Sequence, residues 1–145
     1  MGFFDKLKGI ATSVANIAVK ADNKDLMQAM VASAVVVAYA DGDLSDEEMA
    51  TCSKILKTSS QLTAFGDTPA KLFDTYCTKY EASGRMARVD LLKEIADVKG
   101  NEEEAIRVLV MGIEVADADN DIDDLEMKML NKIADTLGLN LSDFL

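Results

Sequence analysis

The sequence predicts an all-α protein, a single domain over residues 1–145 that folds as a bundle of about seven helices. Pro occurs once and Gly eight times in 145 residues, whereas Ala, Leu, Met, Lys and Glu, which favour helices, are plentiful. Apolar residues also recur at alternating steps of three and four, the spacing of a helix with one buried face. A chain of this length can bury one core and is too short for two ordinary domains.

The first predicted helix lies within residues 1–22 and is amphipathic. Its apolar residues are spaced three or four apart along the chain: Phe3, Leu7, Ile10, Val14 and Ile17. We expect this helix to pack on the core or on a partner. Membrane binding is the less favoured alternative, because an acidic protein is poorly attracted to anionic lipid.

The second predicted helix, capped at Asp22 or Asn23 and running to about Ala40, is apolar nearly all round. Such a helix is surrounded by others, so we expect it to be the central helix of the bundle. The third helix follows Ser45, which is predicted to form a capping box with Glu48 three residues later.

A loop over residues 61–68 is expected next, closed by Thr68 as the cap of the fourth helix and Pro69 at its first position. The fifth helix covers about 85–98, and five residues form its predicted apolar face: Met86, Val89, Leu92, Ile95 and Ala96.

Gly100 and Asn101 mark the start of the sixth helix, whose carboxylates at 102–104 complement the helix dipole. The seventh helix is predicted to stop at Gly138, and the short tail after it to pack back onto the core.

One motif occurs twice, at a constant offset of 78 residues. Residues 40–49 read ADGDLSDEEM, and residues 118–127 read ADNDIDDLEM. An apolar helical stretch precedes both copies and an amphipathic one follows both, so the sequence contains two pseudo-repeated helix–acidic turn–helix units. If these units pack as a pseudo-symmetric pair, both turns open at the same end of the bundle.

The two turns hold charge equal to the whole net charge of the protein. Residues 41–48 contain five carboxylates and residues 117–126 contain six, without a Lys or Arg in either stretch. The remaining 15 acidic residues balance the 15 basic ones, and the net charge is −11. Because no basic cluster is available to neutralise phosphates, we exclude nucleic acid as a direct partner.

Cys52 and Cys77 are the only cysteines and the chain has no His, so neither a redox pair of cysteines nor a Cys/His zinc site is expected. Both cysteines fall on apolar stripes, and we interpret them as core residues. The longest apolar run, 29–40, is too short to span a bilayer, and no cleavable signal is visible. We expect a soluble cytoplasmic protein.

Helix capping explains only part of the acidic turns. Ser45 with Glu48, and Asp123 with Glu126, fit capping boxes. Four other acids precede the caps and are not explained in this way: Asp41, Asp43, Asp119 and Asp121. Like charges gathered there repel one another, which raises their pKa values or calls for a cation.

The candidate metal ligands are therefore acids of both turns: Asp41, Asp43, Glu48, Asp119, Asp121 and Glu126. Oxygen ligands without imidazole or thiolate select hard cations, so Ca²⁺ is expected first, with Mg²⁺ or Mn²⁺ as alternatives. Gly42 and Asn120 occupy the same position in the two turns, and both tolerate the positive φ of a tight turn. Both turns match an EF-hand loop only at its first three ligand positions. The Gly at the sixth position and the Glu at the twelfth position of that loop are missing from both turns.

The sequence resembles the tellurite-resistance TerB family over nearly its whole length. The resemblance rests on the opening GFFDKLKG at 2–9, the two turns at 40–48 and 118–126, and the closing LGL at 137–139 with Phe144. It implies an all-helical fold of about seven helices and a metal site built from both turns. It also implies cytoplasmic work beside other proteins of a tellurite-resistance and stress-response system, with peripheral association through partners at the inner face of the membrane.

Four acids of this sequence fall on the motif acids of the family: Asp41, Glu48, Asp119 and Glu126. Asn120 departs from the Gly that is usual at its position. We expect a non-enzymatic cation-binding module without a small-molecule substrate. The alternatives are a metal-free acidic scaffold that docks onto basic protein partners and, further behind, a two-metal hydrolase built from carboxylates alone.

Overall fold

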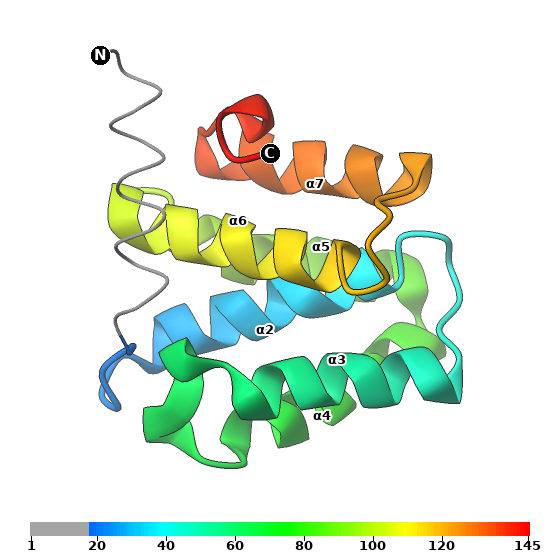
Figure 1. Ribbon diagram of the computed structural model, residues 1–145, viewed down its shortest axis with the longest axis horizontal. Coiled ribbons are helices and arrows are strands. Elements are labelled where there is room, and N and C mark those ends of the chain that lie inside the picture. Colours follow the sequence, from blue (N-terminus) through cyan, green and yellow to red (C-terminus); the bar gives the residue numbers. More distant parts are fainter. Residues whose placement is uncertain (1–17) are drawn as a thin grey trace.

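The computed structural model describes residues 18–145, which contain helices and no strand (Figure 1). The prediction of an all-α fold is confirmed. The predicted first helix falls mainly on residues 1–17, which lie outside the described residues, and residues 18–22 form no helix. The described helices are α2 (Lys24–Ala38), α3 (Asp46–Thr58), α4 (Thr68–Ala82), α5 (Gly84–Ala96), α6 (Glu102–Ala116) and α7 (Asp124–Leu137), with the short 3-10 helices η1 (Ser60–Phe65) and η2 (Leu141–Asp143).

Helix α2 is the centre of the bundle, as its sequence predicts. It contacts each of the other α-helices from α3 to α7, and it lies between α6 on one side and α3 with α4 on the other (Figure 1). Met30, Val31 and Val35 are completely buried. The burial of so much apolar surface around one helix is the main stabilising contribution to this fold.

Helix α6 packs closely against α2 at Gly112. A Cβ added there would lie 2.8 Å from Ser33 Oγ, 3.2 Å from Leu130 Cδ2 and 3.3 Å from Val37 Cγ2. Ser33 Oγ also donates a buried hydrogen bond of 2.9 Å to the carbonyl of Val108 on α6. Gly112 therefore allows the two central helices to touch, and a polar bond fixes their register.

The helix ends follow the capping signals in the sequence. Asn23 Oδ1 accepts a hydrogen bond from Leu26 N at 3.2 Å, and Asn101 Oδ1 accepts one from Glu104 N at 3.1 Å. Gly138 ends α7 with a φ of +73°, the left-handed conformation that glycine adopts at little cost.

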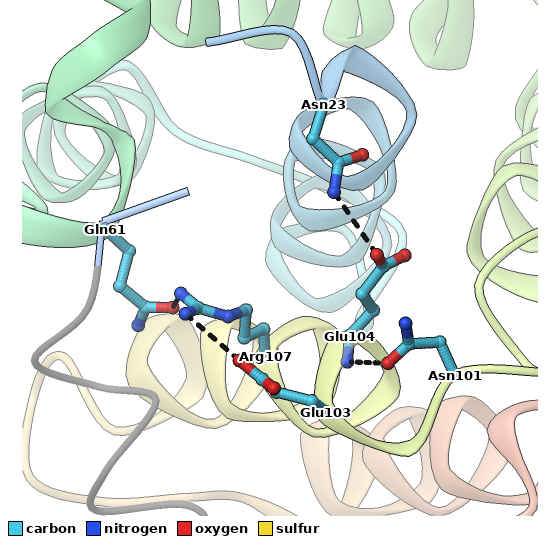
Figure 2. A network of polar contacts seen from close by, with 6 residues as sticks. All are labelled: Asn23, Gln61, Asn101, Glu103, Glu104 and Arg107. Atoms are coloured by element: carbon cyan, nitrogen blue, oxygen red, sulfur yellow. Dashed lines mark hydrogen bonds and ion pairs between the residues drawn. The ribbon is translucent and has the colours of Figure 1, made fainter. Parts of the chain in front are cut away.

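The expected loop at 61–68 is mostly helical. Residues 60–65 form η1, and α4 begins at Thr68, so Asp67 rather than Thr68 occupies the cap position. Gln61 is buried: its Oε1 accepts from Arg107 Nη1 at 3.1 Å (Figure 2). This long-range contact makes η1 part of the core, and no local sequence pattern indicates it.

The predicted buried face of α5 is wrong in part. Met86 and Val89 are 59% and 49% exposed and Ala96 is exposed as well, whereas Ala87 and Leu91 face the core together with the correctly predicted Ile95. Helix α5 packs against α2, α4 and α7 at once. The small Ala87 side chain permits this close packing, whereas the larger Met86 is directed outward.

We expect Gly112→Ala to lower the free energy of unfolding by about 1–3 kcal/mol, because the new methyl group overpacks the α2–α6 contact and displaces Ser33. Urea denaturation measures this change. Gly100→Ala is the matched control, since an added Cβ there meets nothing within 4 Å. Equal stability of the two variants would contradict the close approach described here.

Candidate functional site

The first acidic turn joins α2 to α3 through short-range hydrogen bonds. Asp41 Oδ1 accepts from Asp43 N at 3.1 Å, around Gly42 with a φ of +88°. Ser45 and Glu48 then form the predicted capping box: Glu48 N donates to Ser45 Oγ at 3.1 Å, and Ser45 N donates to Glu48 Oε1 at 3.2 Å.

The second acidic turn, between α6 and α7, has the matching set of bonds. Asp119 Oδ1 accepts from Asp121 N at 3.1 Å, around Asn120 with a φ of +65°. The capping box forms with 2.8 Å between Glu126 N and Asp123 Oδ1, and 3.0 Å between Asp123 N and Glu126 Oε1. Asn120 thus adopts the conformation of its counterpart, Gly42.

These bonds account for acids that capping alone leaves unexplained. Asp41 and Asp119 each close a turn by accepting a backbone N–H two residues on, as Asp does in many turns. Asp43 Oδ1 accepts from Leu44 N at 3.0 Å. Part of the negative charge of the turns therefore has a purely local structural role.

The two turns differ in how they are anchored to the core. Tyr39, directly after α2, stacks on Tyr80 with ring centroids 4.4 Å apart, and its hydroxyl donates to Glu81 at 3.0 Å. At the corresponding position before the second turn lies the exposed Asp117. The first turn is therefore attached to α4, and the second turn has no aromatic anchor at this position.

A cavity of about 240 Å³ lies between the two turns. Three of the predicted ligands line it: Glu48, Asp119 and Glu126. Glu47 lines it as well and was missed, because its place in the first turn of α3 is explained by the helix dipole. Asp41, Asp43 and Asp121 are exposed and do not line the cavity. The structure thus brings together acids from both turns, but not the full predicted set.

The cavity carries negative charge without a basic side chain in its lining. Burial raises the pKa of Glu126 to about 6, and the charges of Asp123 and Asp119 add to the shift, while the Asp123 backbone N–H opposes it. A carboxylate in this position is stabilised by a nearby cation. The carboxylates in this lining are the kind of ligand that a hard cation prefers.

The thiol of Cys52 also lines the cavity, but it is buried. Burial raises the pKa of Cys52 to about 12, and the charges of Cys77, Glu48 and Glu126 contribute. The group is therefore a thiol at neutral pH rather than a thiolate ligand. The sequence-based interpretation of Cys52 and Cys77 as core residues is confirmed by their burial.

Within residues 18–145, no three Asp, Glu or Cys side chains are grouped so that they could hold a metal ion as they stand. In the same part of the chain, no helix is both long and apolar enough to cross a membrane.

A model of the family described as "Tellurite resistance protein TerB" matches residues 27–145. The chain belongs to the TerB family. The match covers both acidic turns, every helix from α3 to α7 and nearly all of α2. No curated protein and no solved structure matches the chain. The resemblance noted in the sequence is thereby confirmed for the family and for its helical fold.

We expect the carboxyl carbon of Glu126 to titrate near pH 6 in chelator-treated protein, as measured by carbon-detected NMR. The pKa of Glu126 is higher in the folded protein than in the unfolded protein, so deprotonation of this side chain lowers the free energy of unfolding. This decrease is absent below the unfolded pKa and reaches its full size above about pH 6. Glu126→Gln keeps an oxygen for the Asp123 N–H and should remove this pH dependence from urea denaturation. A titration midpoint at the unfolded value would contradict the burial of Glu126.

Proposed function

We propose that this TerB protein is a non-enzymatic module that binds a hard divalent cation between its two acidic turns. Ca²⁺ is the preferred ion, with Mg²⁺ and Mn²⁺ behind it. The observation that supports this most strongly is that acids of both turns, Glu48, Asp119 and Glu126, line one cavity whose described lining contains no basic side chain. The ion would compensate a local excess of negative charge.

The capping boxes connect cation binding to the helix ends. Glu48 and Glu126 each accept the cap N–H through Oε1. Their second oxygen, Oε2, is available for a cation, since a carboxylate has several acceptor positions. Glu47 and Asp119 would add further oxygen ligands from the cavity wall. In this arrangement an ion stabilises the first turns of α3 and α7 together.

The buried thiols support a binding role over direct chemistry on tellurite. Burial raises the pKa of Cys77 to about 11, as it raises that of Cys52. Thiol chemistry requires thiolates, and neither residue forms one at neutral pH. We infer that the protein works in the cytoplasm with other proteins of a tellurite-resistance and stress-response system, and that it associates with the inner face of the membrane through these partners.

A second candidate function is an acidic scaffold that binds a basic protein partner without a metal. This function is supported by the surface at the second turn. Leu125 is 48% exposed there, beside the acidic residues Asp123 and Asp124. An apolar side chain within a negative patch suits a partner with complementary charge. Binding of a Lys-rich peptide that shifts the amide signals of Leu125 in chelator would favour this function.

Calorimetric titration of chelator-stripped protein tests the cation proposal. We expect binding of Ca²⁺ and a rise in the thermal unfolding temperature, because the ion binds only the folded state. Absence of both effects at millimolar Ca²⁺, Mg²⁺ and Mn²⁺ would overturn the cation proposal and leave the scaffold.

Matched variants identify the ligands. Glu126→Gln should weaken Ca²⁺ binding by about tenfold or more, because one charge beside a divalent ion contributes more than about 1.4 kcal/mol. Asp124→Asn removes the same charge from the same helical turn but outside the cavity lining, and should change affinity little. Asp119→Asn and Asp41→Asn form a second pair, since only Asp119 lines the cavity. Equal effects within both pairs would place the ion elsewhere.

A further inference from the structure

Helix α5 carries an apolar stripe that the described fold does not cover. Met86 and Val89 are exposed and Leu92 is half-buried, and these three residues follow one another at intervals of three. Residues at this spacing lie on one side of a helix. Large apolar side chains that are exposed together are typical of a surface that binds a partner.

Basic side chains flank this stripe. Arg85 and Lys93 are exposed, and they lie four residues before and four residues after Val89, on the same side of the helix. Neither of them forms an ion pair with another residue of 18–145. We call Arg85, Met86, Val89, Leu92 and Lys93 the α5 face.

The acidic side chains within α5 interact with α4 instead. Asp90 Oδ2 pairs with Lys79 Nζ at 3.1 Å, and Glu94 Oε1 accepts from the hydroxyl of Tyr76 at 3.5 Å. The α5 face therefore combines apolar side chains with positive charge, although the chain as a whole is acidic.

The start of α7 carries the opposite combination. Leu125 is exposed, the exposed acids Asp121, Asp123 and Asp124 precede it, and the exposed Lys128 follows in the next turn. We call residues 121–125 the α7 start. An apolar side chain among negative charges complements an apolar stripe that is flanked by positive charges.

The two surfaces lie at the same end of the bundle. A Cβ added to Gly84, the first residue of α5, would lie 3.3 Å from the ring of Tyr80, which stacks on Tyr39 directly before the first acidic turn. Helix α7 begins directly after the second turn, and both turns lie at the right-hand end of Figure 1. A two-fold axis at this end would form the same contact twice, as in a closed dimer.

We propose that two copies of this chain associate in this way, with the α5 face of each copy against the α7 start of the other. Met86 and Val89 pack on the partner's Leu125, and Arg85 lies beside the partner's Asp124. A second copy is the occupant because the described residues contain both complementary surfaces. Association does not depend on a bound cation, since neither Leu125 nor Asp124 lines the cavity between the turns.

Sedimentation equilibrium of the full chain in chelator tests this association. We expect the weight-average mass to rise towards twice the monomer value as the protein concentration approaches millimolar, and to fall with added salt, which screens the charges. Met86→Asp with Val89→Asp, and separately Leu125→Asp, should keep the chain monomeric. The control Leu145→Asp changes an exposed apolar residue outside both surfaces and should retain the dimer. A monomer at every concentration, equal association of all variants, or growth beyond a dimer would overturn the proposal.

A charge exchange tests which residues meet. Arg85→Glu alone and Asp124→Arg alone should each weaken association by at least about fivefold, because each places like charges against each other. Both changes in one chain should restore association, and circular dichroism of each variant checks that the helices are intact. If the double variant associates no better than the single variants, Arg85 and Asp124 do not meet and the proposed arrangement is wrong.

An anionic membrane is the alternative occupant of a helix face that is apolar and basic. Vesicles of phosphatidylglycerol are therefore sedimented with the protein. Binding by a chain that does not self-associate, abolished by Met86→Asp with Val89→Asp, would assign the α5 face to a membrane and overturn the proposal.

Discussion

The burial of α2 from Leu26 to Val37, where only Gln28 is partly exposed, is the constraint on which the rest of the structure depends. Within residues 18–145, five helices pack around it, and the contact of Gly112 with Ser33 fixes how closely α6 approaches. Each acidic turn follows one of these two central helices. Because α2 and α6 bring their C-terminal ends to one side of the bundle, the turns line a common cavity. The position of the charged site therefore follows from apolar packing far from it.

The same acidic side chains stabilise the turns and helix ends and also provide the negative charge of the site. Asp41 and Asp119 close the turns, and Glu48 and Glu126 complete capping boxes. These local bonds hold carboxylates beside one another despite their repulsion. Burial raises the pKa of Glu126, and the neighbouring charges of Asp123 and Asp119 add to the shift. In the proposed function, the stability of the helix ends and the affinity for a cation would depend on the same side chains, so a change in one would affect the other.

Much of the fold was predictable from the sequence because its signals are short-range. The caps at Asn23 and Ser45 involve atoms three residues apart, and the positive φ of Gly42 depends on that residue alone. The central position of α2 was also predictable, since a helix that is apolar all round must be enclosed. The face of α5 was not, because three neighbouring helices together select Ala87 over Met86 for the interior.

By itself, the sequence determined the helices, their caps, the conformation of both turns, the excess of negative charge and membership of the TerB family. Only the tertiary structure decided that Glu47 shares a cavity with Asp119, that Asp43 and Asp121 remain outside it, and that Gln61 contacts Arg107. The physical reason is distance along the chain. A cap or turn is formed by neighbouring residues, whereas these contacts join segments that only the packing of α3 and α6 around α2 brings together.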